Sequence, residues 1–452
     1  MTRQAAMIRK EPRDMHTSRL EQFDASWRRE VLSSGLTLIS IPRPYDDHFF
    51  LGVTLKVGTR LEQGKHKPGV SHFLEHMMFR GSGRYPDYAQ LAEAFEWLGG
   101  DWNAATGHEH TEYWYSGIKH TAREVIDLFA NFIATPQFTD IEVERSIITR
   151  ELDGETNDHG YSTDLDYHVS TLLWPGTTVA QPILGSRESI ASMTVEDLRR
   201  YRDAFYVPHN MAIAVVGGDE HLLPLLRTAF GDLRSDFNHV AKVSFPALKR
   251  QAGPLVKWVE HSDNEYEIKL SFVCGSEWSS EAQTVELVSR ILADGFCSRL
   301  GRRLREQLGL VYDIHAHPTL GLDVGTLDIG ASCAQDQLDE FMAELMAELR
   351  RLAATGPTAD ELERARVRAI VDLELAPTIP EVIGTRLPWA YLAGRDLSLV
   401  AERERIKAVT TEGAAAWCQG TLKANNAALA VLGPAAKDIE KRLKKALTTG
   451  LG

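Results

Sequence analysis

The feature that most constrains the fold of this chain is a weak internal repeat within its 452 residues. Three pairs of segments share nearly one offset, 216 or 217 residues: HNMAIAVVGG at 209–218 with NNAALAVLGP at 425–434, MTVED at 193–197 with VTTEG at 409–413, and LGVTLKVGT at 51–59 with IKLSFVCGS at 268–276. A common offset between such distant segments indicates the duplication of one structural unit. We therefore expect two homologous halves.

The order of the predicted elements within each half defines the fold class. Each half reads as a strand, a helix, further strands, paired helices and a closing strand, which is an α+β arrangement of two homologous α/β-sandwich halves. The stretch FPALKRQAGPL at 245–255, with its Pro, Gly and charged residues, predicts a linker. We expect a flexible leader at 1–25, an N-terminal half at 26–240, a linker at 241–256 and a C-terminal half at 257–452.

The segment GVSHFLEHMMFRG at 69–81 predicts an amphipathic helix with an unusual polar side. If residues 70–79 are helical, five apolar side chains form one stripe that faces the core: Val70, Phe73, Leu74, Met77 and Met78. His72 and His76 then lie one turn apart on the opposite arc, with Glu75 beside them, and two such imidazoles can hold one metal ion. An ordinary solvated face is the alternative interpretation.

The second half provides a comparison for this helix. Its counterpart there is ELVSRILADG at 286–295, in which Ser289 takes the place of His72 and the His/Glu trio is absent. If helix geometry alone required these residues, the copy would keep something similar. The comparison favours chemistry over architecture as the reason for the trio.

A further candidate ligand lies on the predicted helix TDIEVERSIITRELDGE at 139–155. Glu144 and Glu151 are seven residues apart and nearly superpose on a helical wheel, on an arc that is at least half buried. A buried carboxylate needs a cation, because an unpaired buried charge is costly. The cation is either a metal shared with the histidines or an arginine such as Arg145 or Arg150, and both interpretations stay open at this point.

Charge and composition exclude some classes of function. The formal net charge of -13, without a basic stripe, disfavours nucleic-acid binding and favours cationic partners. The apolar runs fall short of the ~18 residues that span a bilayer, so no membrane insertion is expected. Residues 1–20, MTRQAAMIRKEPRDMHTSRL, lack the apolar segment of a secretory signal, which predicts a cytoplasmic chain.

These motifs together resemble the inverted-motif zinc peptidases of the pitrilysin, insulin-degrading enzyme and mitochondrial processing peptidase type. The H-x-x-E-H pattern stands at 72–76, and ERSIITRE ends at Glu151, which lies 75 residues beyond the second histidine (76 to 151). The resemblance also includes WNAATGHEHTEYWY at 102–115 and ADGFCSRLGRRLREQLGLVYDI at 293–314. It extends over most of residues 30–434, and it implies a fold that forms half of a clamshell chamber.

The resemblance implies a role for each residue of the predicted metal site. His72, His76 and Glu151 would be the ligands of one zinc ion per chain, with the open position of a catalytic site. Glu75 would be the general base, and Glu144 would orient a ligand from outside the metal sphere. Manganese or cobalt also suits such ligands, so the sequence does not decide the metal.

The resemblance also implies how substrate binds. Asn103 and Ala104 would begin an edge strand that pairs with an extended peptide. Arg305 and Tyr312 would bind a substrate carbonyl and stabilise the transition state. From the residues alone, an edge strand kept soluble by its polar side chains and an Arg/Tyr pair on a helix surface are the plain alternatives.

Two classes of function follow from these features. The first is a zinc endopeptidase that hydrolyses unfolded peptides or oligopeptides inside an enclosed chamber, completed by a homodimer or, less favoured, a heterodimer. The same class includes the possibility that this chain is the catalytic subunit of a heterodimeric processing peptidase. The second is a noncatalytic scaffold subunit of the same fold. Because such relatives have typically lost the metal motif that this chain retains, the enzyme is the favoured interpretation.

Overall fold

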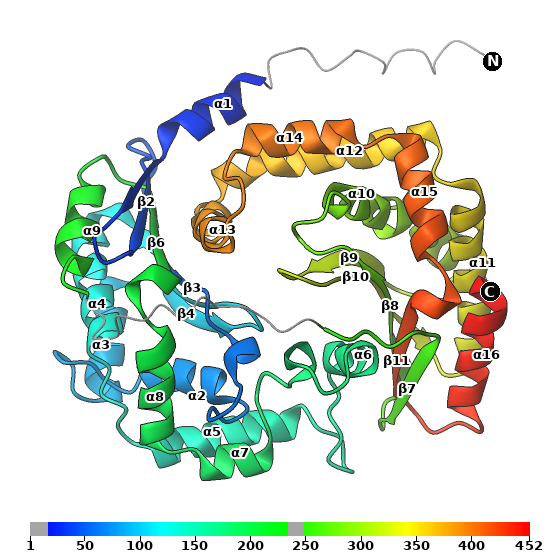
Figure 1. Ribbon diagram of the computed structural model, residues 1–452, viewed down its shortest axis with the longest axis horizontal. Helices are drawn as coiled ribbons and strands as arrows, with labels where there is room; N and C mark the ends of the chain where they lie inside the picture. The colour runs from blue at the N-terminus through cyan, green and yellow to red at the C-terminus, as the bar shows by residue number, and fades with distance from the viewer. Residues whose placement is uncertain (1–16, 234–247) are drawn as a thin grey trace.

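The computed structural model describes residues 17–233 and 248–452, which form two β-sheets (Figure 1). The first has the order β1-β2-β6-β3-β5-β4, with β1 (Arg28–Val31), β2 (Thr37–Ile41), β3 (His48–Leu55), β4 (Asp101–Thr106), β5 (Thr111–Ile118) and β6 (Met211–Val216). The second has the order β7-β11-β8-β10-β9, with β7 (Leu255–Glu260), β8 (Glu265–Cys274), β9 (Ile314–Leu320), β10 (Gly325–Ala334) and β11 (Ala427–Gly433).

The two sheets repeat one topology. In the first sheet β2 pairs parallel with β6, and in the second β7 pairs parallel with β11. The remaining pairs are antiparallel in both. Apart from β1, an additional edge strand of the first sheet, the strand order and directions are equal, which confirms the predicted duplication and the α+β class.

One face of each sheet is covered by helices whose apolar sides form a core with the strands. On the first sheet these helices are α2 (Val70–Met78), α3 (Tyr88–Leu98), α4 (Ala122–Ala134), α8 (Val195–Phe205) and α9 (Leu222–Phe230), with α5 (Ile141–Gly154) and α7 (Arg187–Ser192) beyond α2. On the second they are α10 (Ala282–Ala293), α11 (Leu338–Thr355), α15 (Thr411–Thr421) and α16 (Ile439–Leu451).

The other face of each sheet is covered by a helix from the opposite half. Helix α6 (Leu165–Leu173) packs on β11 of the second sheet, and α13 (Pro380–Ala393) packs on β3 and β6 of the first (Figure 1). The contact at α13 is close, because a Cβ on Gly384 would lie 2.4 Å from the Phe50 ring. This exchange buries the second face of both sheets and joins the halves into one structure.

The predicted leader is wrong in its last part. Residues 1–16 lie outside the described residues, but α1 (Thr17–Ser26) is a helix whose Leu20 is fully buried in a core shared with α14 (Leu399–Ala408). Asp24 accepts hydrogen bonds from the backbone N–H groups of Leu399 and Val400 at 3.1 Å, which satisfies the first turn of α14. These contacts, rather than local helix propensity, fix residues 17–26.

The predicted linker at 241–256 falls partly on residues 234–247, which lie outside the described residues. Residues 248–254 have neither helix nor strand, and β7 already begins at Leu255, so the last two residues of the predicted linker belong to the second sheet. Among the described helices, none combines the length and apolar character that crossing a bilayer requires.

Candidate active site

Helix α2 carries the H-x-x-E-H residues and is held firmly at its start. Gly69, with a φ of 80°, precedes the helix in a left-handed conformation that suits glycine. The carboxylate of Glu62 accepts hydrogen bonds from the N–H groups of Gly69 at 2.7 Å and Ser71 at 2.9 Å, so two donors of the first turn are satisfied. The predicted apolar stripe is fully buried: Val70, Phe73, Leu74, Met77 and Met78.

Much of the polar side of α2 is buried as well. His72 and Glu75 are only 7% and 9% exposed, because α5 covers this side of the helix. The side chain of His76 is 23% exposed, so this side is not an ordinary solvated face. Two buried ionisable side chains beside a partly buried one need a chemical reason to be there, because ionisable groups are rarely buried without a partner.

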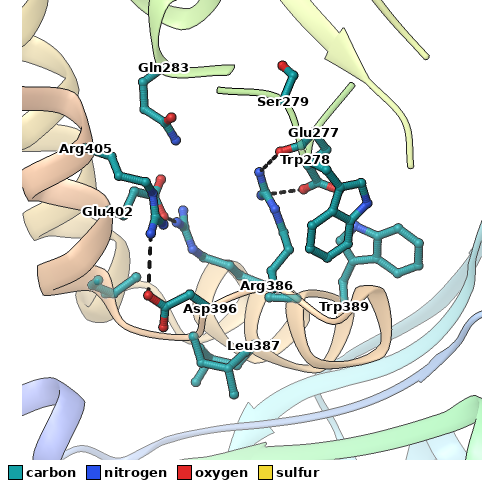
Figure 2. Close-up of a pocket in the computed structure, with 14 residues that line it drawn as sticks. Glu277, Trp278, Ser279, Gln283, Arg386, Leu387, Trp389, Asp396, Glu402 and Arg405 are labelled. Atoms are coloured by element: carbon teal, nitrogen blue, oxygen red, sulfur yellow. Dashed lines mark hydrogen bonds and ion pairs between the residues drawn. The ribbon is translucent and has the colours of Figure 1, made fainter. Parts of the chain in front are cut away.

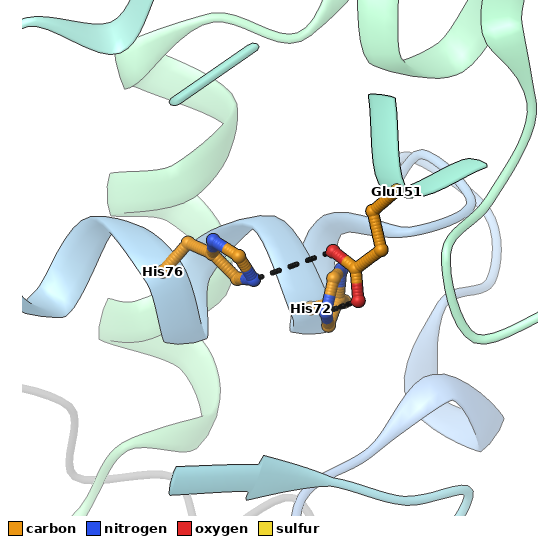
Figure 3. Close-up of side chains that lie close together, drawn as sticks. All are labelled: His72, His76 and Glu151. Atoms are coloured by element: carbon orange, nitrogen blue, oxygen red, sulfur yellow. Dashed lines mark ion pairs between the residues drawn. The ribbon is translucent and has the colours of Figure 1, made fainter. Parts of the chain in front are cut away.

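The structure brings Glu151 of α5 to the two histidines of α2 (Figure 3). The Nε2 atom of His72 lies 3.7 Å from Oε1 of Glu151, and that of His76 lies 3.7 Å from Oε2. One ligand atom of each residue lies within 4.8 Å of the other two. Among the described residues, this is the one group of three such side chains that could hold a metal ion.

The donor set fits zinc in spacing and in chemistry. Donor atoms around a tetrahedral zinc with bonds of ~2.0–2.2 Å lie about 3.3–3.6 Å apart, and each of the two His–Glu151 distances of 3.7 Å is close to that value. Burial, and then the neighbouring His76, lower the pKa of His72 to about 3, which keeps this imidazole neutral as a ligand must be. Nδ1 of His72 is buried without a hydrogen-bond partner among the described residues.

Glu144 orients the second histidine. His76 donates its Nδ1–H to Glu144 Oε2 at 3.1 Å, which directs the Nε2 lone pair toward Glu151. Burial lowers the pKa of His76, but the hydrogen bond to Glu144 and the nearby carboxylates outweigh burial and raise it. Metal binding requires the neutral ring, so it competes with protonation of His76.

The arginine that pairs with Glu144 differs from both candidates considered from the sequence. Oε1 of Glu144 forms an ion pair with Nε of Arg80 at 2.7 Å, and both side chains are 8% exposed. Arg145 instead pairs with Glu142 at the surface, with a distance of 3.0 Å. Arg80 follows α2, so this buried pair joins the end of α2 to α5.

Glu75 lies beside the metal-ligating group and faces the edge strand. Burial raises the pKa of Glu75, and Thr106 Oγ1 donates a hydrogen bond to its Oε2 at 3.0 Å. Thr106 is the last residue of β4, and sequence reasoning missed it. Side chains alternate along a strand, so the sequence could have predicted that Thr106 lies on the same side of β4 as Ala104, two residues earlier.

The site opens into a cavity of about 1000 Å³ that is bordered by the edge strand. His72, Glu75, His76 and Glu151 line it, together with residues 103–106 of β4. β4 is the last strand of the first sheet, so its outer edge has no neighbouring strand among the described residues. The N–H of Ala104 donates to Oδ1 of Asn103 at 2.8 Å.

Arg305 and Tyr312 do not line this cavity. Arg305 belongs to a π-helical turn at Gly301–Gln307, and its guanidinium lies 5.4 Å from the ring centroid of Phe296 and 5.7 Å from that of Tyr312. Tyr312 is 89% exposed and Phe296 is 71% exposed. Within one chain, the predicted Arg/Tyr pair therefore stands on the surface of the second half, apart from the metal-ligating group.

A second cavity, of about 410 Å³, separates α13 and α14 from the loop after β8 (Figure 2). Each of its three arginines pairs with a carboxylate: Arg386 with Glu402, Arg395 with Glu277, and Arg405 with Asp396 at 3.4 Å. The charges in this cavity are thus neutralised by one another. We assign these pairs a structural role in joining the crossing helix α13 to the second half.

Comparison with known proteins identifies the family. The family description Insulinase (Peptidase family M16) matches residues 37–187, and Peptidase M16 inactive domain matches residues 192–368. The chain belongs to peptidase family M16. This confirms the resemblance to the pitrilysin type, and the inactive-domain match covers the helix in which Ser289 replaces a histidine.

Relatives and solved structures agree with this assignment. An uncharacterized zinc protease from Rickettsia bellii is 28% identical over 365 residues, which cover 79% of this chain and 84% of that protein. A protease structure from Helicobacter pylori has a TM-score of 0.80 at 18% identity and covers 90% of this chain and 99% of its own. The periplasmic protease PqqL from Escherichia coli has a TM-score of 0.75 at 20% identity and covers 93% of this chain but 50% of that one. The chain thus has the fold of an M16 peptidase unit and is related to zinc proteases.

Proposed function

We propose that this protein is a zinc-dependent endopeptidase that hydrolyses unfolded peptides. One observation carries the proposal: His72, His76 and Glu151 converge beside Glu75 in an open cavity bordered by a free strand edge. Two histidines and one carboxylate leave a coordination position open, as catalytic rather than structural zinc sites do. The relationship to zinc proteases supports zinc as the metal.

Each residue of the site has a task in peptide hydrolysis. A zinc ion held by His72, His76 and Glu151 would supply Lewis acidity that polarises a carbonyl and makes water more acidic. Glu75 takes a proton from the attacking water as the water oxygen bonds to the peptide carbon. When the C–N bond breaks, Glu75 returns that proton to the leaving amine. Glu144 holds His76 in the tautomer that serves as ligand.

Substrate selection follows from the edge of β4. A peptide that adds a strand beside Asn103 and Ala104 binds through backbone hydrogen bonds, which suit many sequences but require an extended chain. Unfolded peptides and oligopeptides are therefore the proposed substrates, and a compact folded protein cannot present such a strand.

We place the active form in a homodimer. Arg305 and Tyr312 lie outside the metal-lined cavity of their own chain, and the exposure of Tyr312 leaves it available to a second copy. The match to half of the longer E. coli protease supports an assembly of two such units. Mixing Glu75→Gln chains with Tyr312→Phe chains tests this arrangement. After random exchange of subunits about half of the dimers are mixed, and each mixed dimer has one complete site out of two, so about a quarter of wild-type activity returns. An active monomer in light scattering refutes the dimer.

Metal analysis and cleavage of a quenched fluorescent peptide test the enzymatic proposal. We expect about one zinc per chain and a loss of cleavage on chelation. Glu75→Gln should keep its metal while cleavage falls by several orders of magnitude. Glu188→Gln is a matched control, because this carboxylate lines the same cavity but does not belong to the metal-ligating group. Full activity after verified metal removal contradicts the proposal, and metal-free, inactive wild-type protein favours the scaffold alternative.

A further inference from the structure

The carboxylate of Glu75 has one hydrogen-bond partner among the described residues, the hydroxyl of Thr106. This bond holds Oε2 at 3.0 Å and leaves Oε1 without a partner in the described chain. Glu75 is 9% exposed and lines the cavity, so Thr106 is the protein group that restrains its carboxylate among the described residues. The orientation of Glu75 thus depends on a residue of another element, β4.

Thr106 stands where the edge strand and the carboxylate meet. It pairs with Thr111 at the end of the β4–β5 ladder, and its backbone continues the free edge that includes Asn103 and Ala104. Side chains alternate along a strand, so Thr106 shares a face with Ala104, which packs against the core that contains α2. One residue therefore presents its backbone toward the proposed peptide site and its hydroxyl toward Glu75.

We propose that Thr106 is a positioning residue that fixes Glu75 for proton transfer and couples this orientation to the binding of a peptide strand on β4. The inference rests on the proposed peptidase function. A peptide added to β4 restrains the backbone of Thr106, and the hydroxyl transmits that restraint to Oε2. Oε1 is then held toward the cavity, where the proton is received. The residue affects the chemical step more than peptide affinity, because its hydroxyl contacts Glu75 and the added strand would bind to the backbone of β4.

Three variants in zinc-loaded protein test the catalytic part of this inference. Thr106→Val keeps the shape but removes the donor, and we expect kcat to fall about 10-fold or more with KM changed less than about two-fold. Thr106→Ser keeps a hydroxyl and should restore most of kcat. Thr228→Val is the control, because this threonine donates to the carbonyl of Pro224 in its own helix α9 and does not line the cavity.

A second measurement uses metal-free protein and does not depend on activity. If Thr106 and Glu75 are bonded, Thr106→Val lowers the thermal unfolding midpoint by a few degrees in the wild-type background. In a Glu75→Ala background the same substitution should have a smaller effect, because the partner is gone. Zinc content measured on reloading should match the wild type, since no metal ligand is altered.

The outcomes separate this inference from the proposed function. Reduced kcat, rescue by serine and non-additive unfolding midpoints support it. Equal kcat in wild type and Thr106→Val, or a rise in KM alone, overturns it while leaving the zinc peptidase intact. Strictly additive midpoints overturn the coupling between the two side chains. A wild-type protein that binds zinc but cleaves no peptide refutes the proposed function itself.

Discussion

Replacing Glu144 with glutamine tests how far the outer carboxylate controls the metal site. The side chain of Glu144 is 8% exposed, accepts the Nδ1–H of His76 and pairs with Arg80, whose side chain is also 8% exposed. Glutamine keeps the shape but removes the charge, so His76 loses a charge-assisted partner. Changes of this kind lower metal affinity about 10- to 100-fold, which corresponds to about 1.4–2.8 kcal/mol.

The same substitution has a separate effect on stability. Arg80 remains buried without its carboxylate, and an unpaired buried charge costs about 3–5 kcal/mol. The double variant Arg80→Leu, Glu144→Gln also removes the unpaired guanidinium. Compared with Glu144→Gln alone, it should regain much of the stability but none of the zinc affinity. This difference distinguishes a loss of metal control from general unfolding.

The assay is zinc competition against a chromophoric chelator, together with thermal unfolding of the metal-free protein. Glu142→Gln is the matched control, because it removes a carboxylate from the same helix whose side chain is 77% exposed and pairs with Arg145. Exposed pairs contribute about 0–1 kcal/mol, so zinc affinity and stability should hardly change. A folded Glu144→Gln protein with wild-type zinc affinity would refute the reasoning.

Three further predictions concern stability, electrostatics and the joint between the halves. Burial raises the pKa of Glu361, but its hydrogen bonds and ion pair with Arg299 outweigh burial and lower that pKa from 4.5 to about 2. The contribution of ionised Glu361 to the stability of the folded protein is therefore complete above pH 4.5 and is lost as the pH falls toward 2. Unfolding midpoints of wild type and Glu361→Gln should therefore differ most near neutral pH, and a constant difference across this range contradicts the assignment. The net charge of -13 predicts faster cleavage of cationic than of matched anionic peptides, with the preference weakened by salt; a salt-independent preference rejects it. Asp323 accepts two hydrogen bonds from fully buried Arg60, at 2.6 and 2.8 Å, and Glu109 pairs with the same guanidinium. Asp323→Asn should therefore weaken the charge compensation of Arg60 and lower the unfolding midpoint by a few degrees in calorimetry. An unchanged midpoint shows that the Arg60–Asp323 pair does not stabilise the contact between the halves.

Burial of His72 and Glu75 on the polar side of α2 shows what the sequence alone could not predict. Periodicity separated the apolar stripe of α2 from His72, Glu75 and His76, because a helix of known pitch divides its own residues into faces. It did not show whether the second face meets water or another helix. That depends on α5, which comes from a segment about 70 residues further along the chain and covers α2 through tertiary packing.

Partner identity shows the same limit. The sequence indicated that Glu144 needs a cation, but it could not select Arg80 over Arg145, because the choice depends on how the end of α2 lies against α5. The exchange of α6 and α13 between the halves was not predicted either. Helices α6 and α13 occupy equivalent positions in the two repeats. The sequence pattern is therefore the same whether each helix covers the sheet of its own half or that of the other half.

The sequence by itself determined the features that depend on short-range order or on comparison of motifs: the duplication, the α+β class, the amphipathic α2, and the family to which the chain belongs. Tertiary structure alone decided that Thr106 donates a hydrogen bond to Glu75 and that Leu20 and Asp24 hold residues 17–26 against α14. It also decided that Tyr312 lies outside the metal-lined cavity of its own chain. The physical reason is that periodicity encodes which side of an element is apolar. Which distant groups meet there is set by packing and charge compensation over the whole chain.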